Sequence, residues 1–565
     1  MGPKTQAADS LHAMKYRGEG EDFREAMNRV AFALKDNDSH YHELRDMLLN
    51  QRFVPAGRVQ AAMGSTKYVT AFNCAVSMTI NDSFVDGPGS IMHRAHEAAA
   101  TMRMGCGIGY DFSTLRPRGE LITKLQSQAS GPISFMHIFD AICLATASSG
   151  HRRGAQMGVL RVDHPDIEEF VRAKQNTTAL TGFNISVAVT NDFMEAALNG
   201  KDFTLRWNNK DYRTVDAGAL WEMIMRSTWD WGEPGVIFID KVNEMNNLWY
   251  CETIAASNPC AEQMLPPGGM CNLASFNLVK YLTKNEQGKY SIDYDSLVSD
   301  IPAATRAMDN VTDRTRYPLS EQKAEAITKR RIGFGVMGLA NALEACGMTY
   351  ASPEFLDETN KITECLRNAT YAASIELSKE KGPFAHYDER YHSGKFILSL
   401  PEHLRDGITK HGIRNSHLLS IAPTGTISQT CDNVSSGIEP VWAYETVRAI
   451  NTPSGQVQVT VNDYGAAFLE TKGRLARDVA PLEHVDVVIA AQANIDSAIS
   501  KTVNVPATLP WAQFKDVYRH AWEGGAKACA TFTDGGARMG LLGDATTSAP
   551  LACVIDPVTG ERSCE

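Results

Sequence analysis

One short segment of the chain combines side chains that could do chemistry. Residues 258–272 read NPCAEQMLPPGGMCN and place Cys260 and Cys271 on either side of a Pro/Gly-rich turn. Asn258, Cys260 and Glu262 alternate along the segment, so in an extended backbone their side chains share one face. That face offers an amide, a thiol and a carboxylate. These groups suit hydrogen bonding to vicinal hydroxyls, sulfur chemistry and general base catalysis.

A metal site and a structural disulfide are weaker explanations of the two cysteines. Zinc would require a further closely spaced Cys or His, and the chain contains no C-x-x-C pair. A disulfide between Cys260 and Cys271 would leave the Asn/Glu arrangement without a purpose, and reducing compartments disfavour such bonds. Sulfur chemistry is therefore the favoured interpretation, and no metal-ligand set is predicted.

Composition and charge define the broad class of protein. The 565 residues are 43% hydrophobic and 21% charged, which is typical of a soluble globular chain. The formal net charge of −11 argues against a general nucleic-acid binder, because there is no basic excess to neutralise phosphates. The sequence contains neither an apolar run of membrane-spanning length nor a secretory signal at its start. We therefore expect a cytoplasmic protein that binds no nucleic acid and no membrane.

The elements that must position these residues follow from the spacing of apolar side chains. Residues 1–55 have apolar residues at helical spacing and are predicted to form an N-terminal helical segment. Over residues 56–540, strand-like and helix-like runs alternate, which indicates one large α/β domain with much parallel sheet. The predicted strands include 183–190, 203–207, 236–239 and 417–423, and the predicted helices include 165–175 and 335–347.

The last residues, 541–565, are predicted to form a mobile tail because they are rich in small, turn-forming and polar residues. This tail nevertheless contains Cys553 and Cys564. Thiols in such a segment cannot serve as core packing, so a redox role is the favoured interpretation. The turn-forming residues 556–560 between them can bring the two cysteines together.

The motif GFGVMG at 333–338 matches the glycine pattern of dinucleotide-binding sites. Its context does not fit, because EAITKRRI before it is charged and helical rather than a buried strand. Close packing of helices at the glycines is the favoured explanation.

Two other segments have residue types that suit phosphate binding. PTGTIS at 423–428 follows the strand-like HLLSIA and can either cradle a phosphate or cap a helix, and the residues alone leave both readings open. SSGHRRGAQMG at 148–158 places Arg152 and Arg153 in a Gly/Ser-rich loop. Two arginines there suit phosphate contacts, although a solvated loop is the simpler explanation.

Taken together, these segments resemble the ribonucleotide reductases. NPCAEQ followed by GGMCNLASFNL is similar to the active-site finger loop of that family, and FNCAVSM at 72–78 is similar to the strand that carries a partner redox cysteine. Further segments resemble the adenosylcobalamin-dependent, class II form, namely 105–119, 130–140, 151–171, 330–343 and 422–429. The resemblance implies a ten-stranded α/β barrel with the finger loop at its centre.

The resemblance also implies a role for each residue of the central set. Cys260 would carry the thiyl radical that abstracts the 3′ hydrogen of the ribose. Glu262 would accept the 3′-OH proton, and Asn258 would hydrogen-bond the sugar hydroxyls. Cys74 and Cys271 would protonate the departing 2′-OH and close into a disulfide. The implied reaction converts ribonucleoside diphosphates, or triphosphates, to 2′-deoxyribonucleotides for DNA synthesis.

Further sites follow from the same resemblance. Cys553 and Cys564 would reduce the active-site disulfide by exchange, with electrons from thioredoxin or glutaredoxin. A dNTP or ATP effector would bind near a subunit interface, at Asp82 and the loop of Arg152 and Arg153. The segment before the body is too short for an additional overall-activity site, so we expect regulation of specificity alone. The substrate diphosphate would be held by Thr424, Gly425, Thr426 and Ser428.

The source of the radical is the main alternative within the family. Relatives that use a separate metal-containing radical-generating subunit carry adjacent tyrosines, whereas the matching region here has Thr531 and Phe532. This departure favours adenosylcobalamin over a class I-type subunit. The similarity to dimeric class II enzymes implies a homodimer and diphosphate substrates. A regulatory nucleotide-binding protein without activity is the third hypothesis, and the intact central set argues against it.

Overall fold

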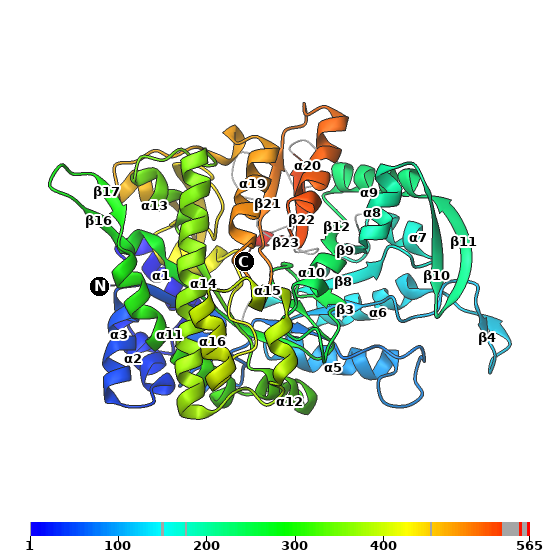
Figure 1. Ribbon diagram of the computed structural model, residues 1–565, viewed down its shortest axis with the longest axis horizontal. Helices are drawn as coiled ribbons and strands as arrows, with labels where there is room; N and C mark the ends of the chain where they lie inside the picture. Colours follow the sequence, from blue (N-terminus) through cyan, green and yellow to red (C-terminus); the bar gives the residue numbers. More distant parts are fainter. Residues whose placement is uncertain are drawn as a thin grey trace.

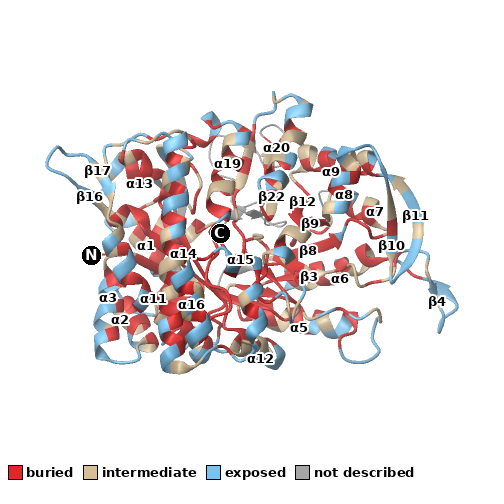
Figure 2. Ribbon diagram, in the orientation of Figure 1, coloured by how far each residue is buried: buried red, intermediate tan, exposed pale blue. Residues whose placement is uncertain are grey.

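Helices and short hairpins surround one large sheet, as Figure 1 shows. The computed structural model describes residues 2–148, 152–175, 178–452, 455–533, 553–555 and 562–564. Buried residues concentrate in the middle of the molecule, and exposed residues lie on the outer helix faces and on the projecting hairpins (Figure 2). Within these ranges, no helix is long and apolar enough to cross a membrane.

The predicted N-terminal helical segment contains three helices. The second helix begins with a capping box, in which the Asp22 side chain accepts from the Glu25 N–H and the Glu25 side chain accepts from the Asp22 N–H. The second and third helices pack against α11, and the first packs against the short helix α17. The bounds are α1 (Gln6–Tyr16), α2 (Phe23–Leu34), α3 (Asp38–Leu49), α11 (Tyr294–Arg314) and α17 (Gly425–Thr430).

The large sheet has ten strands in the described part of the chain and mixes parallel with antiparallel pairs. Its order is β1-β15-β2-β3-β8-β9-β12-β22-β21, with β18 paired to β15. The expected α/β architecture with much parallel sheet is confirmed. The strands are β1 (Phe53–Pro55), β2 (Cys74–Val76), β3 (Gly107–Asp111), β8 (Gln156–Arg161), β9 (Phe183–Val189), β12 (Gly235–Phe238), β15 (Met270–Asn277), β18 (Ile332–Met337), β21 (Thr502–Val505) and β22 (Ala528–Thr533).

Strand β15 joins two parallel sets of strands. All eight of its residues are buried, as expected for a strand covered on both faces. On one edge it pairs antiparallel with β1 and β2, and on the other it pairs parallel with β18. Strands β2, β3, β8, β9 and β12 are parallel to one another, and β12 then meets β22 in an antiparallel pair.

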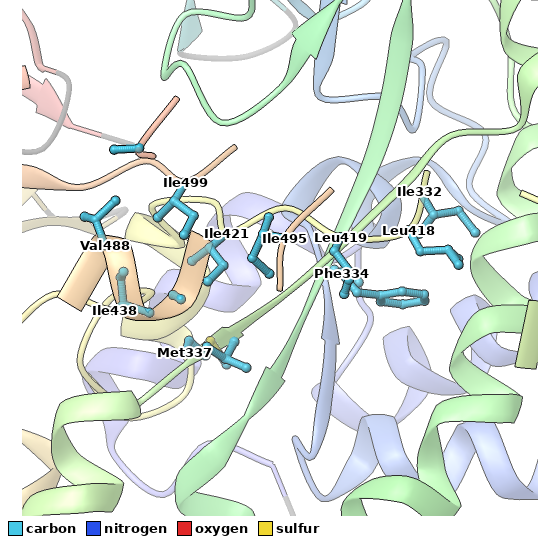
Figure 3. Close-up of a cluster of buried hydrophobic side chains, with 14 of the residues drawn as sticks. Ile332, Phe334, Met337, Leu418, Leu419, Ile421, Ile438, Val488, Ile495 and Ile499 are labelled. Atoms are coloured by element: carbon cyan, nitrogen blue, oxygen red, sulfur yellow. The ribbon is translucent and has the colours of Figure 1, made fainter. Parts of the chain in front are cut away.

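The free edge of β18 is extended by two segments without regular strand structure. Phe334 forms a parallel bridge to Leu419, and Ile421 forms a parallel bridge to Ile499, just ahead of β21. Figure 3 shows side chains from β18, from both segments and from the helix that contains Val488 gathered in one apolar cluster. The strand predicted at 417–423 is therefore present only as these bridges.

The helix predicted at 335–347 is wrong in its first half. The motif GFGVM belongs to β18, whose six residues are all buried, and only Leu339–Ala345 is helical (α13). The break lies at Gly338, which has φ 76° in the left-handed region where glycine is favoured. The two glycines and the preceding charged helix are unusual for a strand that is buried on both faces, so the sequence pattern does not predict it.

The remaining elements cover the sheet or project from it. The strand predicted at 203–207 is present, but it pairs with β11 in an exposed hairpin rather than in the large sheet (Figure 1). The other helices are α4 (Gly57–Ala62), α5 (Ile91–Arg103), α6 (Pro132–Ala145), α7 (Ile167–Arg172), α8 (Asn191–Leu198), α9 (Ala217–Trp231), α10 (Ile239–Glu244), α12 (Ser320–Lys329), α14 (Pro353–Lys381), α15 (Lys395–Leu398), α16 (Glu402–His411), α18 (Tyr464–Phe468), α19 (Pro481–Gln492) and α20 (Trp511–Glu523). The hairpins are β4 (Leu121–Ile122) with β5 (Ser127–Gln128), β6 (Ala147–Ser148) with β7 (Arg152–Arg153), β10 (Asp202–Trp207) with β11 (Lys210–Asp216), β16 (Leu282–Lys284) with β17 (Tyr290–Ile292), and β19 (Glu445–Thr452) with β20 (Gly455–Asn462).

Candidate active site

The segment with the central residues forms a tight hairpin, which we call the finger loop (residues 256–265). Strands β13 (Ala256–Ser257) and β14 (Met264–Leu265) pair antiparallel and hold the six residues between them. Asn258 closes the turn, because its carbonyl accepts from the Ala261 N–H and its Oδ1 accepts from the Gln263 N–H at 2.9 Å. Ala261 has φ 63°. The expected extended backbone is therefore wrong, and a turn presents these side chains instead.

Glycines in the neighbouring strands make room for the finger loop. A Cβ on Gly109 of β3 would overlap the carbonyl oxygen of Ser257, and one on Gly107 would lie 3.0 Å from Pro259 Cγ. On the other side, a Cβ on Gly333 of β18 would lie 2.6 Å from Gln263 Nε2. The glycines of GFGVMG thus allow backbone and side chains of the loop to approach a strand. The predicted helix packing at this motif is wrong.

The backbone of Glu262 is held by three donors from two other segments. Its carbonyl oxygen accepts from the Ala498 N–H at 3.0 Å, from Ser420 Oγ at 2.9 Å and from Ser497 Oγ at 3.1 Å. Both segments belong to the bridged edge beyond β18. The edge of the sheet therefore fixes the position from which the carboxylate projects.

Asn258, Cys74 and Glu262 form one buried chain of contacts. Asn258 Nδ2 donates to Cys74 Sγ at 3.1 Å, and Cys74 Sγ donates to Glu262 Oε1 at 3.6 Å. The second carboxylate oxygen, Oε2, is buried and has no hydrogen-bond partner among the described residues. Burial raises the pKa of Glu262 above its ordinary value of 4.5. Burial and the neighbouring Glu262 raise the pKa of Cys74 well above its ordinary value, so Cys74 is a protonated thiol.

Cys74 and Cys271 lie directly opposite each other in the antiparallel pair of β2 and β15. Both are buried and reduced. Residues opposite each other in such a pair have Cα atoms about 4.5–5.5 Å apart. This range overlaps the Cα separations of disulfides, about 4.4–6.8 Å. The structure therefore brings together two cysteines that are far apart in sequence.

Most of the central residues lie on the wall of one cavity. Asn258, Cys260 and Glu262 line it together with Cys74, although the backbone is a turn. Cys260 is half-buried, whereas Asn258 and Glu262 are each only 2% exposed. The wall also includes residues that the sequence did not single out for this site, namely Tyr16, Gly57, Arg58, Asn73 and Cys106.

The segment predicted to bind phosphate reaches the same cavity. Thr424, Gly425 and Thr426 line it, but Ser428 does not. Ser428 Oγ instead donates to the Gly425 carbonyl at 3.1 Å and lies 3.0 Å from Ser436 Oγ. The Thr424 hydroxyl accepts from the Gly437 N–H at 2.7 Å.

The residues predicted for the effector lie elsewhere. Asp82 accepts from Arg116 Nε at 2.7 Å and from the Arg116 N–H at 3.1 Å, ahead of the β4–β5 hairpin. Arg152 and Arg153 form strand β7, which pairs with β6. Asp82 does not line the cavity. The part of these three residues in effector binding stays a prediction, and the neighbouring His151 lies outside the described residues.

The two tail cysteines also face each other in a short strand pair. Strand β23 (Cys553–Ile555) is antiparallel to β24 (Arg562–Cys564), and Cys553 is the direct partner of Cys564. The other residues of the segment predicted as a mobile tail, 541–565, lie outside the described residues. Its redox role stays a prediction.

Comparisons with known proteins identify the family of the chain. The family model "Ribonucleotide reductase, barrel domain" matches residues 73–474 and 464–532. The chain is 32% identical to a vitamin B12-dependent ribonucleoside-diphosphate reductase of Mycobacterium tuberculosis, over 92% of this chain and 76% of the relative. A protein of the same name from Thermoplasma acidophilum is 31% identical, over 90% of this chain and 68% of the relative. A ribonucleoside-diphosphate reductase subunit alpha of Chlamydia pneumoniae is 27% identical over 61% of this chain and 38% of the relative. The chain belongs to the ribonucleotide reductase family.

Proposed function

We propose that the chain is a vitamin B12-dependent ribonucleotide reductase that converts ribonucleoside diphosphates to 2′-deoxyribonucleotides and so supplies precursors for DNA synthesis. The observation that carries this proposal is the convergence of Asn258, Cys260 and Glu262 on one cavity with the opposed pair Cys74 and Cys271. The names of the two relatives that cover most of the chain support diphosphate substrates and B12 dependence.

The residues on the cavity wall, together with Cys271, account for the atoms and electrons of the reduction. A Cys260 thiyl radical removes the hydrogen from C3′, and Glu262 accepts the 3′-OH proton. Cys74 donates a proton to the 2′-OH, which leaves as water. Cys74 and Cys271 together supply two electrons and form a disulfide, and the hydrogen of the Cys271 thiol ends on C2′. Glu262 returns its proton to the 3′ oxygen, and Cys260 returns its hydrogen to C3′ and so becomes a thiyl radical again. Asn258, beside Cys74, orients the sugar hydroxyls.

The pKa shifts of Glu262 and Cys74 fit these proposed roles. Its raised pKa brings Glu262 closer to neutral pH, and a general base is most effective when its pKa lies near the operating pH. The raised pKa of Cys74 keeps its proton available for the 2′-OH. The second oxygen of Glu262 has no described partner, and a substrate hydroxyl would supply the missing donor.

The residues around Cys260 fit a large radical-generating cofactor. Cys260 and Ala261 at the tip of the turn are half-buried, whereas the residues on either side of them are buried. These two residues would contact the cofactor. Adenosylcobalamin, when bound, supplies the unpaired electron by homolysis of its cobalt–carbon bond. Thr531 and Phe532, at positions where tyrosines would relay a radical from another subunit, also favour this source over a class I-type mechanism.

We also propose that the sheet closes into the ten-stranded barrel of the family. Beyond β18, the Phe334 N–H donates to the Leu418 carbonyl at 2.8 Å, and the Ser500 N–H donates to the Ile421 carbonyl at 2.9 Å. The chain of Ser500 runs directly into β21, which pairs parallel with β22. These contacts support a ring of two five-stranded parallel sets around the finger loop.

The remaining assignments extend the same proposal. Thr424, Gly425 and Thr426 would contact the substrate phosphates, with Ser428 supporting their turn. Asp82, Arg152 and Arg153 would belong to a dNTP or ATP effector site in a cytoplasmic homodimer. Cys553 and Cys564 would pass electrons from thioredoxin or glutaredoxin to the active-site disulfide, and their direct pairing across β23 and β24 supports this.

The purified chain with adenosylcobalamin, dithiothreitol and CDP provides the test. We expect dCDP to form, and we expect no product when the cofactor is omitted. Product only after a second, metal-containing protein is added would refute the B12-dependent assignment. The C260A variant is the matched control, because it should lose all turnover while it retains the fold and effector binding.

A further inference from the structure

Arg58, at the start of α4, is a buried cation without an anionic partner in the described part of the chain. It is 9% exposed, and its Nε is buried without a hydrogen-bond partner. The other buried arginines there are Arg330, Arg331 and Arg367, and each is paired with a carboxylate. No salt bridge joins Arg58 to a described carboxylate. Burial lowers the pKa of Arg58, as expected for a desolvated cation.

The backbone around Arg58 is built to hold its guanidinium in place. Gly105 has φ +91°, and a Cβ added there would lie 2.5 Å from Arg58 Cζ and 2.9 Å from Nη2. Any side chain at this position would displace the guanidinium. Because burying an unpaired charge costs several kcal/mol, a site shaped to retain one implies that a ligand completes the pair.

The position of Arg58 indicates which ligand this is. Arg58 lines the same cavity as Cys260 and Thr424, and it is the cationic side chain on the described wall. Two further wall atoms, Asn73 Oδ1 and Glu262 Oε2, are buried acceptors without described partners. One unpaired cationic donor and two unpaired acceptors match a molecule that carries anionic oxygens at one end and hydroxyl groups at the other.

We propose that Arg58 binds the diphosphate of the substrate by charge-assisted hydrogen bonds. This inference rests on the proposed function, since it concerns the substrate of the same cavity. Guanidinium groups suit phosphate because their planar donors match two oxygens at once. The phosphodiester of a cobalamin offers the same chemistry. Of these two phosphate groups, we assign the diphosphate of the substrate to Arg58, because the cavity wall also includes the Thr424–Thr426 segment and the acceptors suited to ribose hydroxyls.

The test measures binding of inorganic pyrophosphate, hydroxocobalamin and CDP to the full chain and to R58M, which keeps the side-chain length without the charge. Thermal shift reports pyrophosphate binding, absorbance reports cobalamin binding, and turnover gives the KM for CDP. R58Q serves the same test if R58M does not accumulate as folded protein. R103M is the matched control, because Arg103 is exposed at the end of α5 and does not line the cavity.

We expect R58M to weaken pyrophosphate binding and raise the KM for CDP by about ten- to hundredfold, the usual worth of a charge-assisted hydrogen bond. Cobalamin affinity and the melting temperature of the ligand-free protein should not fall, since no internal ion pair is broken. Unchanged pyrophosphate affinity in R58M and R58Q, an equal loss in R103M, or loss of cobalamin affinity alone would overturn the proposal. So would a parent chain that pyrophosphate does not stabilise. A parent that binds pyrophosphate through Arg58 but forms no dCDP would refute the proposed function and support Arg58 only as a diphosphate-binding residue.

Discussion

Replacing Gly109 by Ala should displace the finger loop and reduce turnover. Gly109 lies on β3 where Ser257, the residue just before Asn258, crosses the strand. The added Cβ would overlap the Ser257 carbonyl oxygen and lie 2.9 Å from its carbonyl carbon. Carbon atoms in comfortable contact are about 3.5–4.0 Å apart, and the oxygen lies closer still, so the loop or the strand must move by at least about 1 Å.

This displacement translates into a measurable loss of rate. A misplacement of about 1 Å can cost about a hundredfold in rate, because reacting groups must stay in near-attack geometry. We expect G109A to lower kcat/KM for CDP by about that factor, while overpacking costs about 1–3 kcal/mol of stability. Both are measurable, by initial-rate kinetics with saturating adenosylcobalamin and by thermal unfolding.

The matched control is the same substitution on the neighbouring strand β8. A Cβ on Gly158 would lie 2.8 Å from Met136 Cε, the end of a flexible side chain that can turn aside. G158A should therefore keep activity close to that of the parent. If G109A retains full kcat/KM, or if G158A loses as much as G109A, the finger loop is not positioned by the glycine contact.

Three further predictions concern the titrating and redox groups. For E262Q, we expect kcat to fall about 10²–10⁴-fold through loss of the general base. Because the raised pKa makes the folded parent bind its proton more tightly, the parent loses stability as pH rises through that pKa. The melting temperature of E262Q relative to the parent should therefore increase with pH, and a difference independent of pH would contradict the buried carboxyl. C271S should form no dCDP with any reductant, and a disulfide between Cys74 and Cys271 should be found by mass spectrometry after turnover of the parent without reductant. C553S should lose thioredoxin-dependent turnover but keep dithiothreitol-dependent turnover, and equal losses with both would rule out a shuttle between Cys564 and the active site.

Local features of the site were accessible from the sequence. The amide, thiol and carboxylate at 258, 260 and 262 lie within five residues, so any compact backbone keeps them near one another. The same holds for the N-terminal helices, where apolar spacing and the Asp22 capping box act within a few turns. The register between strands that are distant in sequence could not be predicted in this way. No local pattern places Cys74 opposite Cys271, and only the resemblance to a family led to that pair.

Two misjudged features have one physical cause. The sequence predicts a helix over the second half of β18 because glycines and a preceding charged segment are unusual for a buried strand. Gly333 and Gly335 are nevertheless required by the finger loop and the Ser420 backbone that pass over them. The sequence does not single out Arg58, because an arginine in the segment PAGRV is expected to lie on the surface. In both cases the residue type is determined by a contact with a residue that is distant in sequence. The spacing of apolar residues along the chain cannot reveal such a contact.

The opposition of Cys74 and Cys271 has a consequence for how the molecule works through a cycle. The two sulfurs belong to strands already hydrogen-bonded to each other, so in the proposed mechanism oxidation and reduction would alternate on a fixed frame. One round of substrate reduction would then need no rearrangement of the large sheet. Only the reduction of the disulfide afterwards would require a reductant from outside the active site. Molecules immobilised in a crystal lattice should accordingly complete a single turnover and then stop.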